Sequence, residues 1–153
     1  MSVKKPKLDP ATLAGCLDCA CLSFRQAARV VTQLFDESLV PVGLLSTQLP
    51  ILILLALHDS LAVTRLANLL VMDRTTLTKN LKPLQKRGLV RTLTGPDRRK
   101  TLLRITPEGE ALVARAHPYW RKAQMQIVEG LGAEPWEQMR KRLGHVVKVA
   151  GDR

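Results

Sequence analysis

The sequence predicts a mostly α-helical fold with one small β-hairpin. Apolar residues recur at three- and four-residue spacing over long stretches near both ends of the chain, which is typical of amphipathic helices. Two stretches of alternating residues, LVRTLT and KTLLRIT, flank a Gly-Pro-Asp turn, and this arrangement predicts a hairpin. With 153 residues, 46% of them hydrophobic, the chain is long enough to form one domain with a buried core.

The N-terminal part is expected to contain an arm and two helices. Residues 1–12 are charged and contain proline, which predicts a flexible arm. The apolar spacing over residues 13–35 predicts one long amphipathic helix that ends before the loop VPVGL. A second helix runs to about Leu57, with Ser46 or Thr47 as its cap. Because this helix is apolar nearly all round, we expect it to be buried.

Two short helices precede the hairpin. Residues 61–63 predict a short extended stretch, and Thr64 is expected to cap the brief helix RLANLLV. Asp73 caps the next helix, RTTLTKNLKPLQKR, and Gly88 ends it. Pro83 lies inside that helix, so we expect a kink there. The arrangement is a helix-turn-helix followed by a hairpin, which is called the wing below.

Long helices return after the wing. Thr106 is expected to cap one of them, and the last begins near Glu134. The predicted fold is therefore a winged helix-turn-helix, residues 46–106, flanked by a helical region made of residues 13–45 and 107–150. These flanking helices carry more apolar surface than the central unit can cover, so we expect them to form a symmetric dimer.

The charge of the chain is concentrated in one window. The formal net charge is +11, and residues 73–104 carry ten lysines or arginines but only two acidic residues. Such a basic surface fits nucleic acid or an anionic membrane. The longest apolar run, residues 49–57, is too short to span a bilayer, and the cations do not line one face of an amphipathic helix. We therefore predict that double-stranded DNA, and no membrane, is the partner.

The helix that Asp73 caps is predicted to be the recognition helix. The second helix of a helix-turn-helix enters the major groove by its N-terminal end. Hydroxyls, methyls and cationic groups there can read base edges. The candidate major-groove residues are Arg74, Thr75, Thr76, Thr78 and Lys79.

The wing and the rest of the basic window are predicted to contact the DNA backbone and the minor groove. Inserted arginine is attracted by the negative potential of the minor groove, and Asp97 can hold one arginine in a bidentate pair. The wing candidates are Asp97, Arg98, Arg99 and Lys100. The candidate phosphate contacts, which position without reading sequence, are Thr64, Lys82, Lys86 and Arg87.

The segment VTRLANLLVMDRTTLTKNLKPLQKRGLVRTLTGPDRRKTLLRITPEG resembles the MarR family of bacterial transcriptional regulators. The shared pattern is Asp-Arg-x-x-x-Thr in the recognition helix, Gly-Leu-Val after it, Asp-x-Arg in the wing and Leu/Ile-Thr-x-x-Gly at the end. The resemblance implies a homodimer that binds a palindrome. It also implies repression that is relieved by a small phenolic or aromatic acid, or by cysteine oxidation. It places the wing Asp-x-Arg on Asp97 and Arg99.

The regulatory sites are less defined by the sequence. Cys16 and Cys19 share one helical face and are candidates for redox sensing, whereas Cys21 is expected to pack in the core or an interface. No further Cys or His lies nearby to complete a metal site. His58, together with Arg25, is a candidate for lining a pocket that takes an anionic effector.

Two other classes of protein, an architectural DNA binder and an enzyme, fit the sequence less well than a sequence-specific regulator. A non-specific architectural DNA binder would share the charge but would not need a threonine-rich recognition helix. An enzyme is not expected, because the sequence has no P-loop, no glycine-rich dinucleotide motif and no metal-binding helix. No cofactor is expected. The charged N-terminus has no apolar core of a secretory signal, which favours a cytoplasmic protein.

Overall fold

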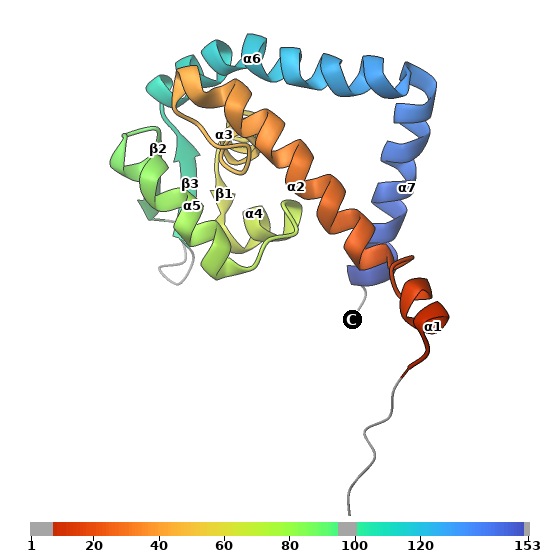
Figure 1. Ribbon diagram of the computed structural model, residues 1–153. Coiled ribbons are helices and arrows are strands. Elements are labelled where there is room, and N and C mark those ends of the chain that lie inside the picture. Colours follow the sequence, from red (N-terminus) through yellow and green to blue (C-terminus); the bar gives the residue numbers. More distant parts are fainter. Residues whose placement is uncertain (1–7, 95–100, 152–153) are drawn as a thin grey trace, which may run out of the picture. The chain divides into compact units, whose positions relative to one another are not determined.

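The computed structural model describes residues 8–94 and 101–151, and it combines helices with one small antiparallel sheet (Figure 1). The chain forms two compact units, Met1–Leu34 and Phe35–Arg153. No helix within the two described ranges is long and apolar enough to cross a membrane. The elements in chain order are α1 Pro10–Gly15, α2 Ala20–Leu39, η1 Val40–Val42, α3 Leu49–Ala56, β1 Leu61–Ala62, α4 Val63–Leu69, α5 Arg74–Lys86, β2 Val90–Thr94, β3 Thr101–Ile105, α6 Pro107–Leu131 and α7 Ala133–Gly151.

The first unit contains a short helix, α1, that starts within the segment predicted to be an arm, residues 1–12, and ends at Gly15. α1 starts at Pro10 because the Asp9 carboxylate accepts hydrogen bonds from the backbone N–H groups two and three residues ahead, both at 3.0 Å. The prediction of one long helix is also wrong. After Gly15 the N–H groups of residues 16–18 bond to carbonyls three residues earlier, and this tight turn separates α1 from α2.

The sheet of the second unit has three strands in the order β1-β3-β2, and both pairs are antiparallel. Leu61 pairs with Leu103, and Val90 pairs with Ile105. The predicted hairpin is confirmed, but the predicted extended stretch is a third strand of the same sheet. The turn residues 95–97 lie outside the described residues.

Apolar side chains from the end of α2, from helices α3 to α6 and from all three strands form the core of the second unit. α3 is buried over most of its surface, as its apolar sequence predicts. Neither Ser46 nor Thr47 caps it, because the helix starts only at Leu49. The largest side chains with less than 2% exposure are Leu39, Ile51, Leu52, Leu55, Leu66, Leu77, Leu84 and Leu103.

Local signals at three helix ends are confirmed. The side chains of Asp73 and Thr106 accept hydrogen bonds from backbone N–H groups in the first turns of α5 and α6. Gly88 follows α5 with a φ of +72°, which glycine adopts without steric cost. The predicted Thr64 cap is wrong, because α4 starts one residue earlier and Ala62 occupies the cap position.

Two prolines lie inside helices of the second unit. Pro83 stands in α5 and Pro118 in α6, and both helices continue through them. The first half of α6 packs against α3, where Trp120 is half-buried next to the core. The Trp120 ring lies 5.9 Å from the ring of His117, measured between centroids.

Candidate nucleic-acid interface

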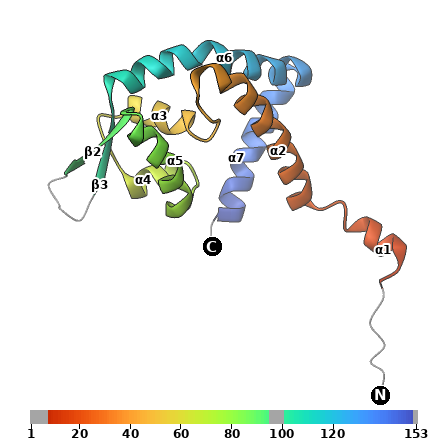
Figure 2. The same cartoon turned by 60° about the vertical axis from the view of Figure 1, so that its left-hand side comes forward.

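α5 presents a polar, cationic face opposite its buried one. α4 and α5 lie side by side, and α5 also contacts β2 (Figure 2). Leu77, Leu81 and Leu84 of α5 are buried, which fixes the helix on the core and directs its other face outward. The predicted major-groove residues all lie on the exposed side, and these are Arg74, Thr75, Thr76, Thr78 and Lys79.

The N-terminus of α5 is held by the Asp73 carboxylate. One carboxylate oxygen accepts the backbone N–H of Thr76 at 2.8 Å, and the other accepts the Thr76 hydroxyl at 2.6 Å. The hydroxyl bond first, and then the N–H bond, lower the pKa of Asp73 below its ordinary value of 3.8. Because the pKa of Asp73 is lower in the folded protein, the cap stabilises the helix fully at pH values above the ordinary pKa. This stabilisation is lost as the pH falls through the lowered pKa of the folded state. The cap is therefore charged at neutral pH.

The three threonines, which the sequence treats alike, differ in their hydrogen bonds. The Thr76 hydroxyl donates to Asp73, and the Thr78 hydroxyl donates to the Arg74 carbonyl at 2.7 Å. These two oxygens retain only their acceptor function and their methyl groups for a base edge. Thr75 makes no side-chain hydrogen bond to any residue in the described ranges, so its hydroxyl can donate as well as accept.

The candidate phosphate contacts lie in two different settings. Lys82 and Lys86 are exposed on α5, and Thr64 is exposed in the first turn of α4. Arg87, at the end of α5, instead donates hydrogen bonds to the carbonyl oxygens of Gly43 at 2.5 Å and of Val42 at 3.3 Å. These bonds could not be found from the sequence, because the partners lie 44 and 45 residues away.

Only the strands of the wing are within the described residues, and the candidates Asp97, Arg98, Arg99 and Lys100 lie outside them. Gln85 of α5 donates to the Thr92 hydroxyl of β2 at 3.0 Å, which joins α5 to the first strand of the wing. Arg104 of β3, part of the basic window, is paired with Asp59 at 2.5 Å. Its charge is thus partly compensated within the chain.

The two predicted pocket residues line separate hollows. Arg25 lies in a hollow of about 450 Å³ on α2, together with Cys19, Cys21 and Arg29. The hollow of His58, of about 250 Å³, includes Asp59, Arg104 and Glu110. The His58 Nδ1 atom lies 2.8 Å from the Leu54 carbonyl oxygen.

A third hollow was not predicted from the sequence. It has a volume of about 100 Å³ and lies between α3 and α6, and its lining is apolar. The lining residues are Leu49, Ile53, Val113, His117 and Trp120. Its walls come from α3 and α6, which lie more than fifty residues apart in the sequence, so no local sequence pattern indicates this space.

The three cysteines are free and exposed. The prediction that Cys16 and Cys19 share one helical face is wrong, because Cys16 lies at the end of α1 and Cys19 precedes α2. Cys21 was expected to pack in the core or in an interface, and its exposed side chain rules out the core of this chain and leaves the interface as a prediction. In the parts of the chain that the structure describes, no group of His, Cys, Asp or Glu side chains could hold a metal ion.

Comparisons with known proteins agree with this arrangement. Residues 42–100 match a family model described as "MarR family". The structure is similar to the crystal structure of the M. tuberculosis transcriptional regulator MosR in complex with DNA, with a TM-score of 0.81, 34% identity, and coverage of 88% of this chain and 97% of that one. It is also similar to the transcriptional repressor CouR bound to a 23-mer DNA duplex, with a TM-score of 0.79, 25% identity, and coverage of 93% and 99%.

One curated relative is the organic hydroperoxide resistance transcriptional regulator of Bacillus subtilis (strain 168), which is 29% identical over 97 residues. The match covers 63% of this chain and 66% of that regulator. The chain thus spans less than two thirds of the length of the curated relatives that it matches.

Proposed function

The chain belongs to the MarR family of transcriptional regulators, and on this basis we propose that it is a sequence-specific repressor that binds a palindromic DNA operator as a homodimer. The exposed N-terminal face of α5 carries this proposal. Its capped first turns present Arg74, Thr75 and Lys79 together, as a helix that reads a major groove requires. Such a protein acts where the chromosomal DNA lies, so we place it in the bacterial cytoplasm.

Exposed apolar residues on the long helices support the homodimer. Side chains of this kind on α2, α6 and α7 are at least 36% exposed in the single chain. So many exposed apolar side chains on long helices are typical of an interface. We propose that residues 13–45 and 107–150 form the dimerisation region and that residues 46–106 bind DNA. The exposed residues are Leu22, Phe24, Val30, Val31, Tyr119, Met125, Leu131, Met139, Leu143, Val146, Val147 and Val149.

The wing supplies a direct test of DNA reading. We expect Arg99→Ala to weaken binding to a DNA fragment from upstream of the protein's own gene by about 5- to 150-fold, because a bidentate or inserted arginine contributes that much discrimination. Lys148→Ala removes one positive charge too, but Lys148 lies in α7, far from the basic window in sequence. This variant should therefore change DNA binding little. Fluorescence anisotropy at fixed salt measures both. Equal losses from the two variants would count against the wing assignment.

The same titration separates a regulator from an architectural DNA binder. Phosphate contacts alone give no sequence preference. If an upstream fragment that contains the operator and a scrambled fragment bind equally at the same salt concentration, the protein is not a sequence-specific repressor.

Relief of repression by a small aromatic or anionic effector is the form of regulation that the family resemblance implies. Oxidation of Cys16 and Cys19 is the second candidate, and the exposure of their thiols favours it. Two thiols would lose two protons and two electrons to form a disulfide, while the O–O bond of a hydroperoxide breaks to give an alcohol and water. If oxidation is the mechanism, peroxide will abolish binding of the wild type but not of the Cys16→Ser/Cys19→Ser variant. If peroxide does not change DNA binding, oxidation is excluded and relief by a small effector remains as the proposed mechanism.

A further inference from the structure

The segment between α2 and α3, residues 40–48, is attached to the middle of the recognition helix. We call this segment the connector. The Thr47 hydroxyl donates a hydrogen bond of 2.7 Å to the Asn80 side-chain oxygen. The Asn80 amide in turn donates to the Thr76 carbonyl at 3.0 Å, one turn earlier in α5. The first attachment therefore ends on a residue of the exposed face that is proposed to read DNA.

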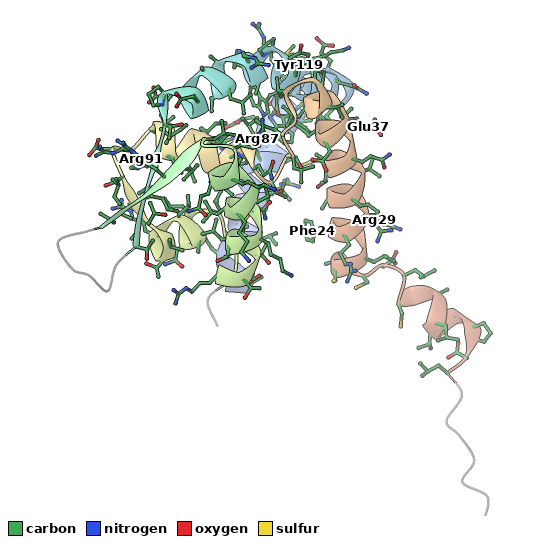
Figure 3. All side chains as sticks on the ribbon, turned by 90° about the vertical axis from the view of Figure 1, so that its left-hand side faces the viewer. Phe24, Arg29, Glu37, Arg87, Arg91 and Tyr119 are labelled. Atoms are coloured by element: carbon green, nitrogen blue, oxygen red, sulfur yellow. The ribbon has the colours of Figure 1, made fainter. Side chains whose placement is uncertain are left out.

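The connector is attached to α5 a second time, at the end of the helix. The two terminal nitrogens of Arg87 donate to the Gly43 and Val42 carbonyls, and Figure 3 labels Arg87 at this end of α5. Gly43 has a φ of +62°, and a Cβ added there would lie 3.8 Å from both terminal nitrogens of Arg87. The left-handed backbone at Gly43 thus brings two successive carbonyls to one guanidinium.

The spacing of the two attachments decides what they can do. Asn80 and Arg87 are seven residues apart, so they lie on the same side of α5 about two turns, or ~10 Å, apart. The buried leucines of α5 already hold the helix on the core. Two attachments on the same side further restrict the tilt of the helix axis and its rotation about that axis.

The connector is itself fixed to the last turns of α2. The Asp36 carboxylate accepts the Ser46 N–H at 2.6 Å, and the Ser38 hydroxyl donates to the Tyr119 carbonyl of α6 at 2.6 Å. Within the connector, the buried Gln48 side chain accepts the Leu45 N–H at 3.1 Å. These bonds tie the connector to the last turn of α2 and tie that turn to α6.

We propose that the connector positions α5 for DNA reading, and that Arg87 is a positioning residue that acts through α5 instead of a phosphate contact. This inference rests on the proposed function. It assigns to Thr47, Gly43 and Arg87 a role that neither charge nor the helix-turn-helix pattern indicates.

Salt dependence and sequence preference together distinguish positioning from phosphate contact. Loss of a phosphate contact lowers the salt slope of binding by about one and weakens binding to all sequences alike. Loss of a positioning contact leaves the slope unchanged and weakens operator binding alone. A variant that is merely less stable lowers the active fraction equally for both DNAs.

The test compares Thr47→Val, Arg87→Ala and Arg87→Lys with the control Lys86→Ala, which removes a neighbouring exposed cation. Binding to the upstream fragment and to a scrambled fragment is measured by anisotropy between about 50 and 200 mM KCl. We expect Thr47→Val and Arg87→Ala to lower the operator-to-scrambled affinity ratio by about two- to tenfold with an unchanged slope. Lysine has a single nitrogen in place of the two guanidinium nitrogens that meet the two carbonyls, so Arg87→Lys should not restore the ratio. Lys86→Ala should lower the slope instead.

Each of the other outcomes contradicts either the positioning role of Arg87 and the connector or the proposed function. If Arg87→Ala lowers the slope by about one and Arg87→Lys restores binding, Arg87 is a phosphate contact. An unchanged ratio in Thr47→Val and Arg87→Ala, with a selective wild type, overturns the positioning role but not the proposed function. A wild type without selectivity overturns the proposed function and the inference together.

Discussion

Replacing Gly109 with alanine is expected to lower the free energy of unfolding by about 1–3 kcal/mol. A Cβ at this position would overlap the Leu89 carbonyl oxygen and lie 2.6 Å from Ile105 Cγ1. The carbonyl cannot move away freely, because it accepts the Thr106 N–H at 3.0 Å. The Gly109 N–H is also the donor to the Thr106 cap, at 3.1 Å. The substitution therefore strains the point where the wing strands meet α6.

Gly130→Ala is the matched control in the same helix. Apart from neighbouring backbone of α6 itself, no atom of the described residues lies within 4 Å of a Cβ added there, and alanine is the better helix former by up to about 1 kcal/mol. We expect this variant to be as stable as the wild type or more stable. Denaturant unfolding followed by circular dichroism measures both. Similar stabilities of the two variants would mean that the Gly109 site relaxes without cost.

The parts of the fold that were predicted correctly depend on local chemistry. A cap such as Asp73 or Thr106 bonds N–H groups two or three residues away, so its signal lies within one short window. The same rule fails where two signals compete. Thr64 has the right side chain for a cap, but α4 already starts at the preceding residue. The single long helix was predicted wrongly for a related reason. The apolar spacing continues on both sides of Gly15, although the helix itself is interrupted there.

The parts that were not predicted depend on partners that are distant in sequence. β1 has two residues, and its place in the sheet is defined by pairing with β3 some forty residues later. For the candidate site, exposure of the cationic face of α5 follows from periodicity, but its attachment to the connector does not. Charge alone therefore assigned Arg87 and Arg104 to the DNA-binding window, although both side chains bond to groups of the chain itself.

We expect Leu143→Glu to make the protein monomeric and to lower operator affinity by about 100-fold or more. Leu143 lies in the exposed apolar stripe of α7 with Met139, Val146 and Val147. A carboxylate buried there without a partner is costly, so the dimer should dissociate. Linking two half-site contacts in one dimer raises affinity by about 10²–10⁴ over a single contact, and the monomer loses that gain.

His145→Glu is the matched control, because it also adds one negative charge to α7 but lies on the side of the helix away from that stripe. Sedimentation velocity gives the oligomeric state, and anisotropy gives the affinity for the upstream fragment. A dimeric Leu143→Glu protein would remove α7 from the interface. A monomer that binds as tightly as the wild type would show that the two half-sites are not bound together. If Leu143→Glu loses both dimerisation and operator affinity while His145→Glu keeps both, each operator must be read by two recognition helices held at a fixed spacing.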